Sequence, residues 1–343
     1  MQKFLVAVDD GYAQTKVYGV DPNDSSKRVR TVYRTSARPG RYMLANISGD
    51  SMVSCYRAEE GDEFTVSDEI VTESTVFDGF HESTMNRVIT RHGLALAGYG
   101  GSHVDLTVGL PVADYFEPDG NRNKGKISRK IANMLKGVER ISPGAPLAVI
   151  DSVDIGCQAF AALFDYALDD DLKPRAGIDI RGKIAVVDIG GRTTDIAVVM
   201  GGSQIDHVAS GTKNLGVLDV YKLLESAIQK KFGTRDSIPY KDLDATVRTG
   251  VIHLWGQEND VKDLVVGAVR EIENQVGREI ERRLGSAAMM NAVVFVGGGA
   301  ALFNGVAHKL RNGVMLDDPE FANARGLWKF AGVMARKTAA ATA

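Results

Sequence analysis

Short apolar runs alternate with helical stripes along the whole chain. In the first half, apolar runs predict strands over 4–8, 15–20, 104–110 and 147–150, and helical periodicity predicts helices over 83–98, 127–135 and 154–168. In the second half, the predicted strands fall over 184–187, 196–200, 204–210 and 293–296, and the helices over 216–231 and 259–284. Strands and helices in alternation predict an α/β protein.

The pattern at the start of the chain returns near its middle. Residues 4–20 and 184–200 both form an apolar strand, a turn that contains Asp and Gly, and a second apolar strand. A repeat at this separation predicts two related domains that face each other. We place these domains at 1–170 and 171–324, with a small inserted subdomain of weak strands at about 35–80, and we expect residues 325–343 to pack back on the first domain.

Composition and charge agree with two domains and exclude some partners. A chain of 343 residues is too long for one hydrophobic core. The net charge of −3 gives no electrostatic reason for direct binding to nucleic acid or to a membrane. No run reaches the ~20 apolar residues of a membrane span. Cys55 and Cys157 lack the spacing of a metal site, which favours reduced thiols in a cytoplasmic protein.

The first candidate site is the turn DDGYAQTK over residues 9–16. A glycine directly after a strand, here Gly11, lets backbone N–H groups approach a phosphate, and Lys16 supplies a positive point charge. A neighbouring carboxylate, Asp9 or Asp10, can hold a magnesium ion through water. By itself the segment is better explained by an ordinary Asp-Gly hairpin.

The second candidate site is the turn DIGGRTTD over residues 188–195. Two glycines and two threonines between strongly apolar strands exceed what a hairpin needs. Their backbone and hydroxyl groups can wrap a terminal phosphate, and these residues are Gly190, Gly191, Thr193 and Thr194. Asp188 can orient a magnesium ion or a water molecule, and Arg192 can add positive charge.

A third glycine-rich segment follows the last predicted strand. Gly297, Gly298 and Gly299, followed by Ala300, permit close approach by a flat ring or a sugar, and a helix that starts near residue 301 would offer N–H groups to a phosphate. The segment is not a Walker loop, because no Gly-Lys-Ser/Thr follows it. It is not a dinucleotide fingerprint either, because the Gly-x-Gly-x-x-Gly spacing is missing.

The order of these three motifs resembles the superfamily of actin, heat-shock chaperones and sugar kinases. Within it, the chain resembles the plasmid-segregation actins of the ParM/StbA family over nearly its whole length. Segments typical of that family are LPVADY at 110–115, ISRKIAN at 127–133, NLGV at 214–217 and FANARG at 321–326. The resemblance implies the actin-like fold, a duplicated ribonuclease H-like fold whose two domains enclose a nucleotide cleft.

The resemblance assigns roles where residues match. Asp9 or Asp10 takes the acidic position of the first motif and Lys16 its lysine, and Asp188 takes the acidic position of the second. Asp9 and Asp188 are therefore expected to hold Mg²⁺, and Asp188 to be catalytic. Nucleotide contacts are expected at Asp9, Asp10, Gly11, Tyr12, Ala13, Lys16, Gly190, Gly191, Arg192, Thr193, Thr194, Asn214, Gly216, Gly297, Gly298, Gly299 and Ala300.

One catalytic position departs from the family pattern. The family carries a Glu or Gln after the strand between the first two motifs, where it positions the attacking water. Here we expect Asp151 in this role, with Asp154 as the competitor. A helix N-cap would explain either residue without catalysis. Tyr12 also replaces a small Ser, Thr or Asn, which leaves the γ-phosphate contacts open.

The resemblance implies an ATPase that forms filaments and segregates plasmid DNA. Its cofactors would be ATP, with GTP as an open alternative, and Mg²⁺. Its partners would be further copies of itself and a DNA-binding adaptor on a centromere-like plasmid site. A chaperone of this superfamily would need a further domain. A small-molecule kinase remains an alternative although no catalytic base is evident, and so does a cell-shape or scaffold filament.

Overall fold

The first large sheet has the strand order β3-β2-β1-β7-β9 in the computed structural model, which describes residues 3–42, 53–67 and 73–342. β1, β2 and β3 form an antiparallel meander, and β7 and β9 continue the sheet parallel to β1. β1 and β7 are mostly buried, as the predicted apolar runs require. The bounds are β1 Lys3–Asp10, β2 Gln14–Val20, β3 Arg28–Arg34, β7 His103–Leu110 and β9 Val149–Cys157.

The second large sheet repeats this plan and confirms the predicted duplication. Its main order is β12-β11-β10-β16-β17, with β13 also paired to β11. β10 and β11 are antiparallel, and β16 lies parallel to β10. Every residue of β16 is buried, as expected for a parallel strand covered on both faces. The bounds are β10 Lys183–Ile189, β11 Thr194–Met200, β12 Gln204–Ile205, β13 Gly211–Lys213, β16 Ala292–Val296 and β17 Gly313–Met315.

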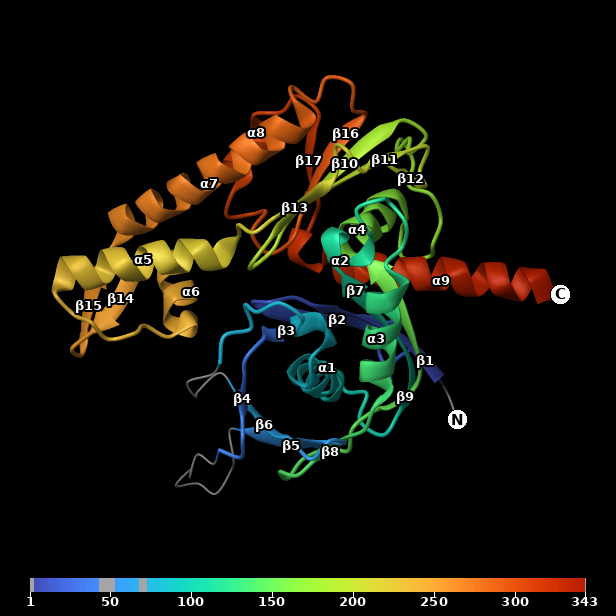
Figure 1. Ribbon diagram of the computed structural model, residues 1–343, viewed down its shortest axis with the longest axis horizontal. Coiled ribbons are helices and arrows are strands. Elements are labelled where there is room, and N and C mark those ends of the chain that lie inside the picture. The colour runs from blue at the N-terminus through green and yellow to red at the C-terminus, as the bar shows by residue number, and fades with distance from the viewer. Residues whose placement is uncertain (1–2, 43–52, 68–72, 343) are drawn as a thin grey trace.

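Two helices lie between the large sheets (Figure 1). α4 (Gln158–Ala167) packs against β10 and β11, and α9 (Ala322–Thr342) packs against α4, β1 and β2. α9 therefore returns from the second half of the chain to the first sheet, where Leu327 and Trp328 join a core with Ala7 and Tyr18. The division of the chain into two domains at residue 170 stays a prediction.

A smaller unit lies at the bottom of Figure 1. The sheet β4-β6-β5-β8 packs on α1, and three of its strands fall within the segment predicted as an insertion at 35–80, of which residues 43–52 and 68–72 lie outside the described residues. Ser83 caps α1 through its Oγ, which accepts a hydrogen bond from the Asn86 N–H at 3.1 Å. The bounds are β4 Ala37–Pro39, β5 Ser54–Ala58, β6 Glu63–Val66, β8 Val138–Arg140, η1 Phe80–Glu82, α1 Thr84–Leu96, α2 Val112–Tyr115 and α3 Lys124–Leu135.

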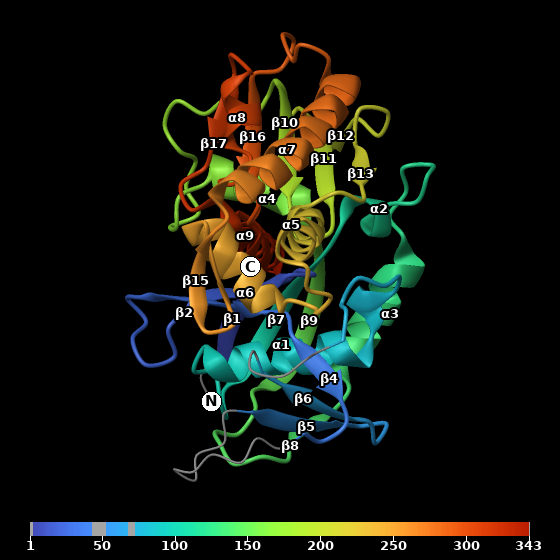
Figure 2. The same ribbon diagram turned by 90° about the vertical axis from the view of Figure 1, so that its left-hand side faces the viewer.

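A second peripheral unit belongs to the other half of the chain and lies opposite the first (Figure 2). It consists of α5, α6 and the hairpin β14–β15, and α7 connects it to the second large sheet. The apolar stripe predicted for α7 is buried, with Ile272, Val276 and Ile280 in the core. The bounds are α5 Val217–Phe232, α6 Tyr240–Thr249, β14 Val251–Leu254, β15 Gln257–Asp260, α7 Lys262–Leu284, α8 Asn304–His308 and η2 Pro319–Phe321.

Three sequence predictions are wrong at specific places. β9 runs to Cys157, so the strand predicted at 147–150 is too short and the helix predicted from 154 starts at Gln158. Of the strand predicted at 204–210, only β12 at Gln204–Ile205 is strand, and β13 begins just beyond the predicted range, at Gly211. The helix predicted near residue 301 is a series of turns, and α8 begins at Asn304. Within the described residues, no helix has both the length and the apolarity of a membrane span.

A buried charge cluster fastens α9 to α4. The Asp165 carboxylate accepts hydrogen bonds from the guanidinium of Arg325 at 2.7 Å and from the ammonium of Lys329 at 2.8 Å. Asp165 and Lys329 are both buried. Because loss of one partner would leave buried cations without compensation, the docking of α9 depends on this carboxylate.

We expect Asp165→Ala to lower the free energy of unfolding by about 3–5 kcal/mol, the usual cost of breaking a buried ion pair. Urea denaturation followed by circular dichroism measures it. Asp170→Ala is the matched control, because Asp170 also approaches Lys329, at 3.5 Å, but is exposed, so its loss should cost less than about 1 kcal/mol. Equal effects of the two substitutions would contradict this account.

Candidate nucleotide site

The site is a cleft where the carboxyl ends of the two central strands face each other. The turn between β1 and β2 and the turn between β10 and β11 meet so closely that a Cβ on Gly191 would lie 2.5 Å from the Cβ of Ala13. The enclosed cavity measures about 310 Å³, within the range of ligand pockets. Because glycine has no side chain, the two turns can approach each other closely and still leave room for a ligand between them.

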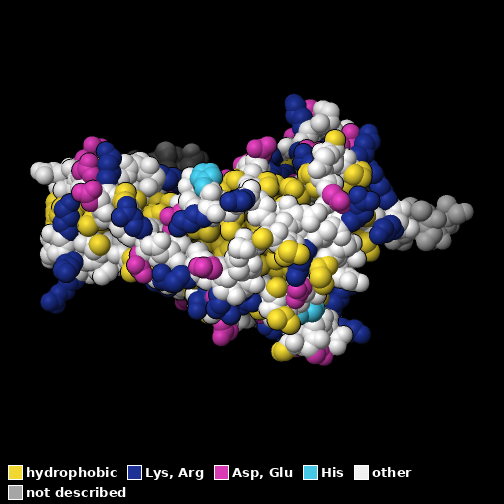
Figure 3. All heavy atoms as spheres, turned by 90° about the horizontal axis from the view of Figure 1, so that it is seen from above, with side chains coloured by type: hydrophobic (Ala, Val, Ile, Leu, Met, Phe, Trp, Pro, Cys, Tyr) yellow, Lys and Arg dark blue, Asp and Glu magenta, His cyan; other side chains and the backbone are white. Residues whose placement is uncertain are grey.

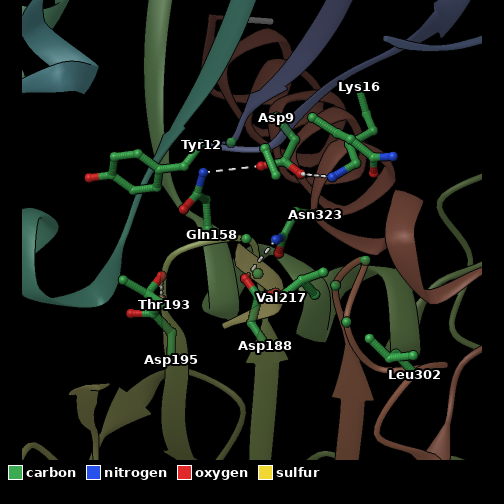
Figure 4. Close-up of a pocket in the computed structure, with 18 of the residues that line it drawn as sticks. Asp9, Tyr12, Lys16, Gln158, Asp188, Thr193, Asp195, Val217, Leu302 and Asn323 are labelled. Carbon is green, nitrogen blue, oxygen red and sulfur yellow. Dashed lines mark hydrogen bonds and ion pairs between the residues drawn. The ribbon is translucent and has the colours of Figure 1, made fainter. Parts of the chain in front are cut away.

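Asp9 and Asp188 approach the cavity from opposite walls (Figure 4). Both are buried. Burial raises the pKa of Asp9 to about 6, and Asp188 and Asp10 add to the shift, while Lys16 opposes it from 3.8 Å. Burial likewise raises the pKa of Asp188 to about 6, and the Asp195 carboxylate adds to this shift. Burial thus disfavours the ionised form of both carboxyl groups, and a bound cation would stabilise that form.

Asp10, the neighbour of Asp9, has charged partners outside the cavity. Its carboxylate accepts a hydrogen bond from the buried ammonium of Lys130 at 2.5 Å and lies 3.4 Å from Nδ1 of His81. Burial alone would raise the pKa of Asp10, but Lys130 and His81 bring it down to about 2. Asp10 is therefore an ionised structural partner of Lys130, and of the two adjacent acids only Asp9 lines the cavity.

Amide and hydroxyl groups hold the cleft carboxylates in place. Gln158 Nε2 donates to Asp9 Oδ1 at 3.0 Å, and Asn323 Nδ2 donates to Asp188 Oδ2 at 2.7 Å. The other amide atom, Asn323 Oδ1, is buried and has no partner among the described residues. Thr193 Oγ1 donates to Asp195 Oδ2 at 2.9 Å. Both carboxylates at the centre of the cleft are thus held by neutral donors.

The third glycine segment forms the wall beside Asp188. Gly297 has φ +90°, and a Cβ there would lie 2.4 Å from Asp188 Oδ1. A Cβ on Gly299 would lie 2.7 Å from Cγ2 of Ile189. Beyond these glycines the cavity continues between Val217 on α5 and Leu302 (Figure 4). Apolar side chains therefore border the cavity beside its polar centre.

Most of the predicted contact residues line the cavity, and several do not. Lining residues are Asp9, Gly11, Tyr12, Ala13, Lys16, Asp188, Gly190, Gly191, Thr193, Gly297, Gly298 and Gly299. Residues that do not line it are Asp10, Arg192, Thr194, Asn214, Gly216 and Ala300. Two of these have a clear packing role instead. Thr194 Oγ1 donates to the Leu215 carbonyl, and a Cβ on Gly216 would lie 2.4 Å from the Gly191 carbonyl oxygen.

Arg192 reaches across to the other half of the molecule. Its guanidinium donates to the Phe77 carbonyl at 3.1 Å and to Asp78 Oδ1 at 2.9 Å, and it lies 5.1 Å from the centre of the Tyr12 ring. The Tyr12 ring also packs against Phe80, at 5.2 Å. The unusual tyrosine therefore contributes backbone to the first turn, while its ring points away from Asp9 and Asp188 (Figure 4).

Asp151 does not lie in the cleft, which corrects the prediction for this residue. It sits at the start of β9, at the end of the sheet remote from the cavity, and His103 Nδ1 lies 2.8 Å from its Oδ1. Asp154, also on β9, is exposed and does not line the cavity. The error arose because β9 extends seven residues beyond Ile150, so the position after the strand is Gln158.

Gln158 and Asn323 are site residues that sequence analysis missed. The signal for Gln158 was the alternation of Val153, Ile155 and Cys157, which marks a continuing strand that ends just before it. Asn323 lies in the segment FANARG, where nothing local points to a contact 135 residues away with Asp188. At the far end of the cavity, unpredicted lining residues are Arg34, Tyr221, Asp244, Val247 and Arg248.

Two family models match this chain, one in each half. Residues 4–166 match the family described as plasmid segregation protein ParM, N-terminal, and residues 186–307 match the archaeal actin homologue MreB-like, C-terminal. Both halves of the chain therefore resemble actin-like proteins, each over a match of less than half of the chain. No curated protein sequence matches this actin-like protein.

Solved structures similar to this actin-like protein share its fold. A 15-stranded ParM filament from Clostridium botulinum has 19% identity and a TM-score of 0.75, covering 97% of this chain and 99% of that chain. The archaeal actin homologue Ta0583 in complex with ADP has 18% identity and a TM-score of 0.73, covering 96% and 99%. Actin-like protein Alp7A has 13% identity and a TM-score of 0.74, covering 99% of both chains. The actin-like fold, with two domains around the cleft, is thereby confirmed.

The raised pKa values of Asp9 and Asp188 predict a pH-dependent stability of the ligand-free protein. Each folded-state pKa of about 6 exceeds the ordinary value of 3.8, so the folded state binds the proton more tightly. Stability is therefore lost as pH rises through about 6. Without nucleotide or divalent metal, Asp188→Asn should stabilise the protein by about 2 kcal/mol at pH 8 and by much less at pH 4.5.

Thermal unfolding of both proteins at the two pH values measures this difference. Asp171→Asn is the control, because Asp171 is exposed and its removal should change stability equally little at both. If Asp188→Asn and the unmodified protein have the same melting temperature at pH 8, burial of the ionised Asp188 carboxylate does not destabilise the folded state.

Proposed function

We propose that this protein binds ATP with Mg²⁺ in the cleft and hydrolyses it. The observation that carries the proposal is the contact between the two glycine turns, with Asp9 and Asp188 buried on opposite sides of it. Backbone N–H groups of both turns can cradle a polyphosphate. Val217, Leu302 and Gly299 supply a slot for the base and sugar. The arrangement supports a nucleoside triphosphate and leaves the choice between ATP and GTP to experiment.

The carboxylates fit a magnesium ion. Burial is the main cause of their raised pKa values, so a bound cation would stabilise the ionised carboxylates, and Asn323 Oδ1, which has no partner among the described residues, adds a neutral acceptor. Asp9 and Asp188 would hold the ion through its water shell, because Mg²⁺ keeps several waters in such sites. The ion would supply charge stabilisation to the phosphates.

The residues of the chain take three roles in hydrolysis. Lys16 Nζ, 3.8 Å from Asp9 Oδ2, supplies a fixed positive charge to the phosphates. Gln158, held by its hydrogen bond to Asp9, orients the attacking water, which is the role that the family gives to a Glu or Gln after this strand. Asp188, opposite Asp9, anchors the ion or its water. A fixed water and fixed charges are most of what phosphoryl transfer requires.

We further propose that nucleotide binding drives assembly into filaments that segregate plasmid DNA. A ligand that touches both turns favours the closed cleft, and closed subunits joined head to tail make an open polymer. Hydrolysis removes the phosphate shared by the turns and weakens that state. The net charge of −3 suits a DNA contact made through a basic adaptor on a centromere-like site, in the cytoplasm.

Substitution of Gln158 tests the catalytic assignment. We expect Gln158→Ala to reduce phosphate release from ATP by about 100-fold, the scale of a lost positioning group, and to retain nucleotide binding. Asp151→Ala should hydrolyse ATP at the normal rate, because Asp151 lies at the other end of β9. Normal turnover by Gln158→Ala, or slow turnover by Asp151→Ala, would reverse the assignment.

Light scattering with ATP and Mg²⁺ tests the assembly. We expect scattering to rise on addition of ATP and to decay as phosphate is released, and Asp188→Ala should show neither signal. Electron microscopy of the scattering sample should show filaments. Monodisperse particles at every concentration, together with phosphate transfer to a sugar or another metabolite, would instead establish the small-molecule kinase alternative.

A further inference from the structure

An exposed tryptophan occupies an unfavourable position at the tip of the hairpin β14–β15. The register pairs Leu254 with Gln257, so Trp255 and Gly256 form a two-residue turn. Both have positive φ, 50° and 74°, which is the geometry of a type I′ turn. Asn-Gly suits this turn, whereas a bulky residue at positive φ is strained. Trp255 is nevertheless 71% exposed, and its ring meets the fold only through an edge contact with Phe232, with the ring centres 6.3 Å apart.

A groove lies at the opposite end of the same part of the molecule. α7 starts two residues after the hairpin and its 23 residues span about 34 Å, so its far end lies well away from Trp255 (Figure 1). The groove lies along that end of α7 and has a partly apolar lining from Ile280, Met290 and Leu310. Met289, beside it, is 86% exposed. Methionine side chains adapt their shape to aromatic partners.

The charges of the groove and of the hairpin are complementary. Arg278, Lys309 and Arg311 line the groove together with a single acid, Glu281. Within the described part of the chain these three cations take part in no ion pair. The hairpin has no Lys or Arg, and its acids Glu258 and Asp260 stay exposed although His253 and Lys262 approach them at 3.5 and 3.6 Å. Seen from above, the surface of the molecule mixes basic, acidic and exposed hydrophobic side chains (Figure 3).

We propose that Trp255 of one subunit inserts into this groove on the next copy of the chain. Trp is enriched at the energetic centres of protein interfaces, and guanidinium groups stack favourably on its ring. A knob and a groove at opposite ends of one body make a heterologous contact, which repeats without closing. The inference rests on the proposed assembly into filaments and identifies the contact that builds them.

Trp255→Asn separates the assembly role from a folding role. It places the preferred residue in the turn, so it should raise the melting temperature slightly, whereas a purely structural Trp255 would give a lower one. It should also raise the critical concentration for ATP-dependent assembly by at least about 30-fold, the effect of losing an interface hot spot. Val208→Asn is the control, because Val208 is 94% exposed but outside both surfaces and should assemble normally.

Crosslinking tests the groove as the receptor. Gln257→Cys on the hairpin and Ser286→Cys in the groove, combined in one chain, should give a ladder of covalent oligomers with ATP, Mg²⁺ and a short bismaleimide. Each single variant should give no ladder, since the native Cys55 and Cys157 are buried. Gln257→Cys combined with Ser203→Cys is the matched control and should also give none.

The outcomes distinguish the two proposals. If the unmodified protein assembles but Trp255→Asn assembles at the same concentration, or the Gln257→Cys/Ser286→Cys protein gives no ladder, the contact assigned here is wrong, the groove serves another ligand, and the filament proposal stands. If the unmodified protein never assembles with ATP and Mg²⁺, the filament proposal fails and the contact fails with it.

Discussion

The structure is organised around two carboxylates that are buried on opposite walls of one cleft, where burial raises the pKa of each. Asp9 and Asp188 end equivalent strands of two equivalent sheets, and the glycine turns bring those strand ends together. Their nearest fixed partners are mainly neutral amides, with Lys16 as the nearby cation on one side. Such an arrangement is poorly compensated when empty and well matched to a metal-bound polyphosphate. The duplication of the fold therefore places both carboxylates at one cleft, which also provides the space for a ligand.

The sequence predicted the parts of this site that are local. A turn such as DIGGRTTD combines its glycines and acids within eight residues, and its flanking strands are strongly apolar, so position and chemistry could be inferred together. The large sheets and the long helix α7 followed from periodicity in the same way. The error at Asp151 was also local, because exposed polar residues on one face of β9 concealed the buried alternation that carries the strand to Cys157.

The rest of the site depends on contacts between distant segments, which one sequence does not reveal. Asn323 holds Asp188 across 135 residues. Tyr12 looked like a defect in the phosphate turn, yet its ring sits against Phe80 and beneath the guanidinium of Arg192. Through Arg192, which also donates to the Phe77 carbonyl and to Asp78, the second turn is joined to the first half of the chain.

The return of α9 to the first sheet has a consequence for how the protein folds. Leu327 and Trp328 complete the core beneath Ala7 and Tyr18, and Lys329 and Arg325 neutralise Asp165. During synthesis the first half of the chain leaves the ribosome long before these residues do, so its sheet waits with an uncovered apolar face and a buried acid without its cations. Contacts of such high sequence separation form slowly, and exposed sheet surfaces favour aggregation meanwhile. The first large sheet is therefore synthesised early but completed only when α9 docks, and we expect chaperones to bind this sheet in the meantime.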